Sequence, residues 1–189
     1  INENIGYAVG EGGKVIKTTD GGTTWTQQNI STTALLYDSY FLTDQKGWIC
    51  TSEGYVFKTT DGGTNWIGVG VLSSGSLIAI DFISATTGFV VGDNFTSGFV
   101  EIYKTADAGS GWSAINPPLG MSSVLDIEFI DDLKGFVLDY YDLYYTSDGG
   151  LSWVLISDIS GSIQLSRIEM LDSQIGWITG VNGVIFKTT

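Results

Sequence analysis

Four copies of one short phrase punctuate the sequence, and their spacing constrains the fold more than any other feature. The copies read TTDGGTTW from Thr18 to Trp25, TTDGGTNW from Thr59 to Trp66, TADAGSGW from Thr105 to Trp112, and TSDGGLSW from Thr146 to Trp153. The tryptophans that end successive copies are 41, 46 and 41 positions apart, and a further copy begins at Lys187. A period near 40 residues is typical of repeated supersecondary units, most often the blades of a β-propeller.

Each repeat contains short apolar segments separated by Gly, Asp and Ser turns, which is the pattern of an all-β protein. We therefore predict an arc of four-stranded antiparallel blades that is part of a larger propeller. The predicted division is a partial blade in residues 1–30, blades in 31–72, 73–117 and 118–158, and a partial blade in 159–189. Residues 171–189 align in register with residues 1–19, which indicates a window from a longer array.

Charge and composition argue against several functions. The chain has 8 basic and 21 acidic residues, a net charge of −13, so no basic face for nucleic acid or anionic lipid is expected. No apolar run reaches the ~18 residues of a membrane span. Histidine, the commonest general base and metal ligand, is absent, and the lone Cys50 cannot form an intrachain disulfide. We predict no catalytic residue, no cofactor and no metal site.

The repeated phrase resembles the Asp box, or BNR repeat, of the form Ser/Thr-x-Asp-x-Gly-x-Thr-Trp. Its setting, a Gly-aromatic pair followed by apolar-Lys-Thr-Thr-Asp-Gly-Gly, most resembles propeller proteins that are similar to the photosystem II assembly and stability factor. Similar repeats occur in sialidases, in xyloglucan-cleaving glycosidases and in sortilin-type receptors. The resemblance covers essentially the whole chain. It implies a propeller fold, and the similarity to assembly factors implies docking to another protein.

The box residues themselves have a structural interpretation. A carboxylate in a Gly-rich hairpin can accept bonds from the N–H groups of its own turn, glycine supplies backbone freedom, and tryptophan supplies buried area. The third box has Ala108 and Gly111 in place of Gly and Thr, which weakens its turn bonding. The predicted structural residues are Asp20, Gly22, Trp25, Asp61, Gly63, Trp66, Asp107, Gly109, Trp112, Asp148, Gly150 and Trp153.

A ligand surface is expected on the face opposite the boxes, where the repeats differ most. The third unit has a longer loop there, and the fourth combines acidic and aromatic residues. Exposed aromatic rings beside carboxylates suit a protein contact or sugar stacking. The predicted partner-binding residues are Asp93, Asn94, Phe95, Phe99, Asp139, Tyr140, Tyr141 and Asp142. The expected partner is a neutral or basic protein, with a glycan as a second possibility.

Polar residues also alternate with core residues in the first segment of each unit. They are Asp38, Tyr40, Asp81, Asp126, Glu128, Arg167 and Glu169. They are expected to line a wet central channel, because buried charges need partners or water. A pair such as Asp81 and Glu128 could also serve glycosidase chemistry, although the interpretation as channel wall is favoured.

These observations favour a non-catalytic scaffold that binds a protein or helps to assemble a complex. Sialidases bind their anionic sugar with three arginines, whereas Arg167 is the only arginine here, and a Ser or Cys hydrolase needs a base. The alternative is a glycan-binding or glycoside hydrolase propeller, closer to xyloglucanases than to sialidases. The acidic repeat with no disulfide suits a bacterial protein that is secreted, at the cell surface or associated with a membrane complex. An extracytoplasmic location, whether periplasmic, at the cell surface or secreted, is therefore expected.

Overall fold

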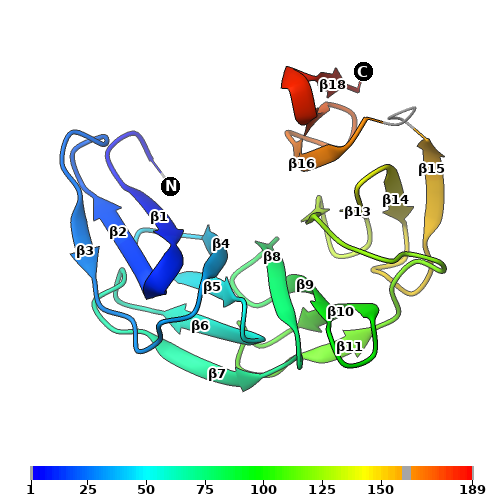
Figure 1. Cartoon of the computed structure of the whole chain (residues 1–189). Helices are drawn as coiled ribbons and strands as arrows, with labels where there is room; N and C mark the ends of the chain where they lie inside the picture. Colours follow the sequence, from blue (N-terminus) through cyan, green and yellow to red (C-terminus); the bar gives the residue numbers. More distant parts are fainter. Residues whose placement is uncertain (1, 159–162, 189) are drawn as a thin grey trace.

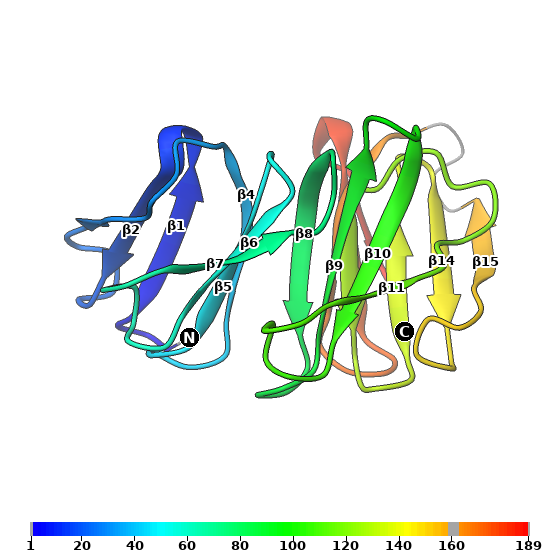
Figure 2. The same ribbon diagram turned by 90° about the horizontal axis from the view of Figure 1, so that it is seen from below.

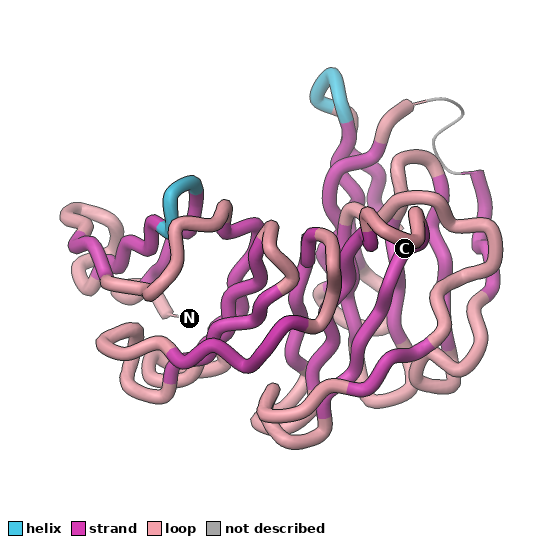
Figure 3. Tube along the Cα trace, turned by 60° about the horizontal axis from the view of Figure 1, so that its bottom comes forward, coloured by secondary structure: helices cyan, strands magenta, loops and turns pink. Residues whose placement is uncertain are grey.

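The computed structural model describes residues 2–158 and 163–188. Within these residues the strands form five antiparallel sheets, and the only helical segments are the short 3-10 turns η1 (Glu11–Gly13) and η2 (Val181–Gly183) (Figure 3). The sheets follow one another around a common axis as an open arc, with a gap between the first and the last (Figure 1). The predicted all-β propeller arrangement is confirmed.

The three central blades have four strands each, in chain order. Blade 2 consists of β4 (Leu36–Phe41), β5 (Gly47–Thr51), β6 (Tyr55–Thr59) and β7 (Ile67–Val71). Blade 3 consists of β8 (Ser76–Phe82), β9 (Gly88–Asn94), β10 (Phe99–Thr105) and β11 (Ser113–Ile115). Blade 4 consists of β12 (Asp126–Phe129), β13 (Gly135–Leu138), β14 (Asp142–Thr146) and β15 (Val154–Asp158).

The two end blades have three strands each among the described residues. Blade 1 consists of β1 (Gly6–Gly10), β2 (Lys14–Thr18) and β3 (Thr26–Gln28), and blade 5 of β16 (Leu165–Met170), β17 (Gly176–Gly180) and β18 (Ile185–Lys187). By alignment with the central blades, blade 1 lacks a first strand and blade 5 lacks a fourth. The predicted boundary between the fourth and fifth units, at residue 159, lies outside the described residues.

The box turns owe their shape to one hydrogen-bond pattern. In blade 2, the buried Thr59 hydroxyl donates to Asp61 Oδ1 (2.9 Å) and accepts the N–H of Gly63 (2.9 Å). Asp61 also accepts the backbone N–H and the side-chain amide of Asn65 (2.9 and 2.7 Å). Blades 1 and 4 repeat these contacts. The box carboxylate therefore acts as an acceptor for its own turn.

The third box is weaker, for the reason that its sequence indicates. Asp107 accepts the N–H of Gly111 (2.8 Å), but glycine has no side chain to donate to the second carboxylate oxygen. Ala108 has a φ of 62°, where the other boxes place glycine. A side chain is strained in this left-handed region, so the third turn has less hydrogen bonding and more backbone strain than its counterparts.

Stacked aromatic rings join the blades. Tyr7 of β1 stacks on Phe41 of β4 with 3.6 Å between ring centroids, and Trp66 meets Phe41 edge-on at 6.0 Å. The same arrangement recurs as Trp48, Phe82 and Trp112, and as Phe89, Phe129 and Trp153. We call each set of three rings an aromatic seat. Such offset and edge-on pairs add stabilisation beyond the area that they bury.

The glycine that precedes each second-strand aromatic is required by this packing. The ring of Phe41 lies over Gly47, its partner across the β4–β5 pair, and a Cβ on that glycine would lie 2.3 Å from the ring. Phe82 covers Gly88 and Phe129 covers Gly135 in the same way, at 2.6 Å. The Gly-aromatic pair thus marks the contact point between neighbouring blades.

Trp25 differs from the other box tryptophans. We expected a buried anchor in every box, yet Trp25 is 45% exposed, whereas Trp66 is buried and Trp112 and Trp153 are partly buried. Blade 1 lacks the first strand that would place a ring over this indole. The prediction of a buried anchor was therefore wrong for this box, because the burial of a box tryptophan depends on the first strand of its own blade.

Candidate functional site

On the face opposite the boxes, the extra residues of the third unit lengthen β9 and β10 to seven residues each, and the loop of residues 95–98 joins these two strands. Asn94 holds it in shape: its Oδ1 accepts the N–H groups of Thr96 and Ser97 (2.9 and 3.0 Å), and its Nδ2 donates to Glu101 (2.7 Å). Asn94 therefore organises the loop from within. Phe95 lies in this loop and Phe99 directly follows it, and their side chains are 71% and 68% exposed. The loop lies at the end of blade 3 away from the turn between β10 and β11 (Figure 2).

The equivalent loop of blade 4 behaves similarly. We expected Asp139 to contact a partner, but it is buried, and its Oδ1 accepts the N–H groups of Tyr141 and Asp142 (2.8 and 2.7 Å). The carboxylate fixes the turn, so as a contact residue Asp139 was wrongly predicted. Tyr140 and Tyr141 remain 44% exposed each, and their rings lie 6.4 Å apart.

The two remaining polar residues of the prediction are only partly accessible. Asp93 and Asp142 are half-buried. Burial raises the pKa of Asp93, and the N–H of Val124 opposes that shift. These residues contribute negative charge beneath the loops, whereas the aromatic rings form the accessible part.

A cavity of about 760 Å³ lies beside the β9–β10 loop. Strand β10 contributes Phe99, Glu101 and Tyr103, and the crossover to blade 4 contributes Pro117 and Leu119. Leu119 is fully exposed, an apolar side chain in an ordered loop that the sequence interpretation missed. Its signal was available: a leucine after two prolines in a turn segment has no core to enter.

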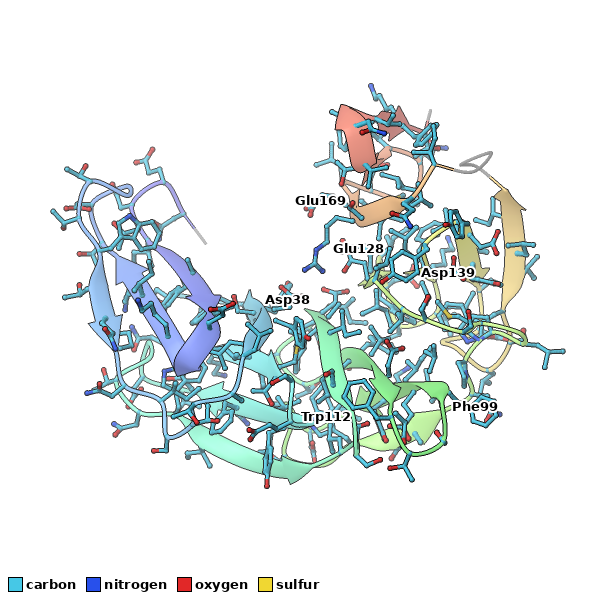
Figure 4. The ribbon with its side chains drawn as sticks, viewed as in Figure 1. Asp38, Phe99, Trp112, Glu128, Asp139 and Glu169 are labelled. Atoms are coloured by element: carbon cyan, nitrogen blue, oxygen red, sulfur yellow. The ribbon has the colours of Figure 1, made fainter. Side chains whose placement is uncertain are left out.

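We define the partner surface as Phe95, Phe99, Leu119, Tyr140 and Tyr141. These side chains are exposed and come from loops of blades 3 and 4. Figure 4 labels Phe99 and Asp139 on these neighbouring blades. The surface combines rigid rings with backbone held by Asn94 and Asp139. That combination lowers the conformational cost of binding.

The predicted central channel is present as a second cavity, of about 580 Å³. It is lined by polar residues of the first strands β4, β8, β12 and β16, which face the axis of the arc, where Figure 4 labels Asp38, Glu128 and Glu169. The lining includes Asp38, Tyr40, Asp81, Asp126, Glu128, Arg167 and Glu169.

The channel aspartates bridge neighbouring blades. Asp38 accepts the N–H of Ile80 (3.1 Å), Asp81 that of Phe129 (2.8 Å), and Asp126 that of Ile168 (2.9 Å). In each case a carboxylate on the first strand of one blade reaches the first strand of the next. Asp126 also forms an ion pair with Arg167 at 3.3 Å.

Burial dominates the electrostatics of the channel. It raises the pKa of Asp81 and of Asp126 to about 6. Burial, followed by the charges of Asp81, Glu169 and Asp126, raises the pKa of Glu128 to about 9. These carboxyl groups hold their protons at unusually high pH because burial disfavours their charged form, and neighbouring carboxylates add to that effect for Asp81 and Glu128.

The chemistry available in the channel is limited by these contacts. One oxygen of Asp81 accepts the backbone N–H of Phe129, and the carboxyl groups that line the channel lie on four different strands. Within residues 2–158 and 163–188, no group of three or more His, Cys, Asp or Glu side chains is placed to hold a metal ion. The described segments also contain no helix long and apolar enough to cross a membrane.

Solved structures share this fold. A structure described as YCF48 bound to D1 peptide matches with a TM-score of 0.52 and 16% identity, over 100% of this chain and 90% of that one. YCF48 from Cyanidioschyzon merolae matches with a TM-score of 0.58 and 16% identity, over 96% and 78%. An ancestral GH74 enzyme matches with a TM-score of 0.73 and 17% identity, over 95% of this chain but 26% of the enzyme. Comparison with curated proteins gave no match.

At these identities the structures establish the fold alone, and the family follows from the sequence. The model of one family, described as photosynthesis system II assembly factor YCF48, matches residues 1–117. That segment is more than half of the 189 residues and includes the first three boxes. The chain therefore belongs to the family of the photosynthesis system II assembly factor YCF48.

Proposed function

We propose that this chain is a non-catalytic propeller scaffold that binds a segment of another polypeptide at the partner surface. The observation that carries the proposal is the exposure of Phe99 and Leu119 beside a cavity, together with that of Phe95 on the adjacent β9–β10 loop, which Asn94 holds in shape. Exposed aromatic and apolar side chains on an ordered frame are the usual anchors of a protein contact. A solved relative, YCF48, is described with a bound peptide, which agrees with a peptide-binding role.

The partner is neutral or basic. The net charge of −13 disfavours an acidic partner, and Glu101 and Asp93 place carboxylates near the apolar surface. Charge complementarity of this kind increases the association rate more than the final affinity. Association should therefore slow as salt is added.

A glycan-binding or glycosidase function is the second candidate. The carboxyl groups of the channel favour it, because a glycosidase needs two of them. The bridging role of Asp81 and Asp126 counts against it, since each has an oxygen bound to the neighbouring blade. Hydrolysis of xyloglucan by the chain, lost on Glu128→Gln, would favour this candidate over the scaffold.

We also propose an extracytoplasmic location. The support is compositional: an acidic chain, rich in short polar residues, with one buried cysteine. Protease treatment of intact source cells, followed by detection of the chain, tests it. Protection of the chain both in intact cells and after the outer envelope alone is opened, with cleavage only after lysis of all membranes, would indicate a cytoplasmic protein.

Binding is tested with a displayed peptide library selected on the wild-type chain. Selected peptides should be neutral or basic, and the triple variant Phe95→Ala, Phe99→Ala, Tyr140→Ala should bind them at least ~30-fold more weakly, as expected for anchor residues worth about 2 kcal/mol or more. Because these side chains are exposed, unfolding free energy should change by no more than about 0.5 kcal/mol for each.

The control is Ile67→Ala with Leu151→Ala, two apolar residues that are also exposed and lie away from the partner surface. It should bind the selected peptides like the wild type. Equal binding by the triple variant and the wild type would show that the contact lies elsewhere.

A further inference from the structure

The fourth strand of blade 3 covers only part of the third. Strand β10 has seven residues, but β11 pairs with it only at residues 102–104. In blades 2 and 4 the fourth strand pairs with the third as far as its first residue, Tyr55 or Asp142. Among the described residues, no strand pairs with residues 99–101 on the outer side of β10. A complete blade in the middle of the chain thus has a free strand edge.

Two prolines end the pairing. Continuation of the register between β10 and β11 would place residues 116–118 opposite residues 99–101, and Pro117 and Pro118 have no N–H to donate. The carbonyl of Asn116 instead accepts the indole N–H of Trp153 (3.0 Å), and Met121 is buried in the core between blades 3 and 4. The crossover is therefore fixed on blade 4 rather than on β10.

The cavity of about 760 Å³ lies beside this free edge. Residues 99–103 of β10 line one side, and residues 114–122 of β11 and the crossover line the other. Phe99 and Leu119 are its exposed apolar side chains. A free strand edge beside an apolar groove is the arrangement that binds an extended segment through main-chain hydrogen bonds.

Glu101 gives this groove a negative charge whose hydrogen bonding is incomplete. Its Oε1 accepts the Nδ2 of Asn94 (2.7 Å), whereas its buried Oε2 has no hydrogen-bond partner among the described residues. The neighbouring hydroxyl of Tyr103 donates its one hydrogen to the carbonyl of Leu72 (2.6 Å). Burial first, and then the carboxylate of Glu101, raise the pKa of Tyr103 to about 12, so this hydroxyl stays neutral. Glu101 can therefore accept a further donor, and a cation is the strongest.

We propose that residues 99–101 of β10 bind an extended segment as an added antiparallel strand, with a Lys or Arg side chain against Glu101 and an apolar side chain against Phe99 and Leu119. The inference rests on the proposed function and specifies its partner. The negative charge of the groove and the net charge of −13 favour a basic occupant.

Strand geometry sets the sequence that fits. Phe99 and Glu101 are two positions apart, so their side chains lie on the same face of β10. The residues opposite them in a paired segment are also two positions apart. An antiparallel segment continues the line of β11 and forms the slightly more stable kind of ladder. Its pattern, read from the N-terminus, is a basic residue, any residue, and an apolar residue.

The probe is a fluorescein-labelled peptide of sequence Ser-Thr-Lys-Val-Phe-Thr-Ser. Fluorescence anisotropy with the 189-residue chain should show saturable binding. Replacement of the lysine by norleucine keeps the aliphatic stem and removes the charge, and should weaken binding by about tenfold, as expected for loss of a charge-assisted hydrogen bond.

Two N-methylated probes separate backbone pairing from side-chain contact. Alternate residues of a strand direct their N–H groups to opposite edges. One probe carries N-methyl groups on the lysine and the phenylalanine, and the other carries them on the two neighbouring residues, the valine and the second threonine. One of the two should lose binding by about tenfold or more, and the other should bind like the unmethylated peptide.

Two variants of the chain locate the lysine. Glu101→Gln keeps an oxygen for Asn94 and removes the charge, so it should weaken binding of the lysine probe by about tenfold and leave that of the norleucine probe unchanged. Asp93→Asn is the matched control, because it makes the same change of charge on the adjacent strand and does not line the cavity. Circular dichroism of both variants checks that the sheets are intact.

The outcomes separate this inference from the proposed function. Equal binding of the two methylated probes, or equal losses in Glu101→Gln and Asp93→Asn, would reject edge pairing. The partner surface would stand in that case if library-selected peptides still lose affinity for its triple variant. No binding of the probe by a folded chain also rejects edge pairing, and both proposals fail if the library yields no peptide either. Concentration-dependent self-association that Glu101→Gln abolishes would show that a second copy occupies the edge instead.

Discussion

The carboxylates of the box turns and those of the central channel come from the same repeat but have opposite properties. The box aspartates are at the surface and accept several short hydrogen bonds, which hold the pKa of Asp20 and Asp148 at about 2; the largest contributors are the side chains of Thr24 and Ser152. In the channel, Asp81 and Asp126 are buried, Glu128 is half-buried, and all three have raised pKa values. Hydrogen bonding therefore governs one set and desolvation the other, although both stabilise the same blades.

This contrast fixes how stability depends on pH. A carboxyl group with a raised pKa stabilises the fold fully below its unfolded value, and that contribution is lost as pH rises through about 6 for Asp81 and Asp126 and about 9 for Glu128. A group with a lowered pKa stabilises the fold above pH 3.8 and loses its contribution as pH falls toward 2. The chain should be most stable in mildly acidic solution.

The largest expected effect is in the channel. Glu128→Gln removes a group that must either keep its proton or carry a buried charge beside Asp81, Asp126 and Glu169. Between about pH 7 and pH 9.5 the wild-type free energy of unfolding should fall, while that of the variant stays flat. The difference amounts to about 1.4 kcal/mol for each unit of pKa elevation that is titrated. Urea unfolding at both pH values measures it.

The matched control for this prediction is Glu53→Gln, an exposed residue in the turn between β5 and β6 that does not line the channel. Its pH dependence should follow the wild type. A wild-type unfolding free energy that is constant over this range would contradict the assignment of Glu128 as a proton-holding group.

A smaller effect, independent of pH, is expected beneath the boxes. Thr59→Val removes the hydroxyl that binds the buried N–H of Gly63 and should destabilise the fold by about 1–3 kcal/mol. Thr18→Val makes the same change in blade 1, where Gly22 is exposed and water can replace the lost bond. Thermal unfolding should show a clear loss for Thr59→Val and little for Thr18→Val. Equal losses would mean that burial of the turn does not matter.

The smallest expected effect concerns the third box, in which Asp107 has no side-chain donor at position 111. Gly111→Ser would give Asp107 the side-chain donor that Thr24 and Ser152 give to their own box aspartates. The pKa of Asp107, which the N–H of Gly111 already lowers most, should fall further. The loss of folding free energy on acidification should therefore begin at a lower pH. Carboxyl NMR titration measures the shift. Gly111→Ala adds the same Cβ without the hydroxyl and should not reproduce it.

The fold could be predicted from the sequence because the same phrase recurs at a regular spacing along the chain. Each Gly-aromatic pair and each box could be located by spacing alone, and the polar positions that line the channel followed from alternation within the first strands. The hydrogen bonds within a box could also be predicted, since Thr, Asp and the turn glycines lie within five residues of one another. Features encoded by near neighbours in the chain were thus accessible.

What the sequence could not supply was burial that depends on another blade. Trp25 and Trp66 have the same local sequence context, but only Trp66 has a first-strand ring, from Phe41, to pack against. Asp139 looked like a surface carboxylate until its loop was seen to close over it. Leu119 differs from Trp25 and Asp139, because its position after two prolines in a turn segment was a signal in the sequence itself.

The glycine beneath each stacked ring has a consequence for how such a chain can grow. Each of the three central blades contains both halves of an interface: a glycine-aromatic pair for the following blade, and a ring for the preceding one. Duplication of one repeat within a gene therefore adds a blade with a complementary packing surface on each side, and no compensating substitution is required. Deletion of a repeat rejoins two surfaces that already fit. Length can vary by whole units during evolution, whereas a single change of that glycine would damage a joint that no neighbouring repeat can repair.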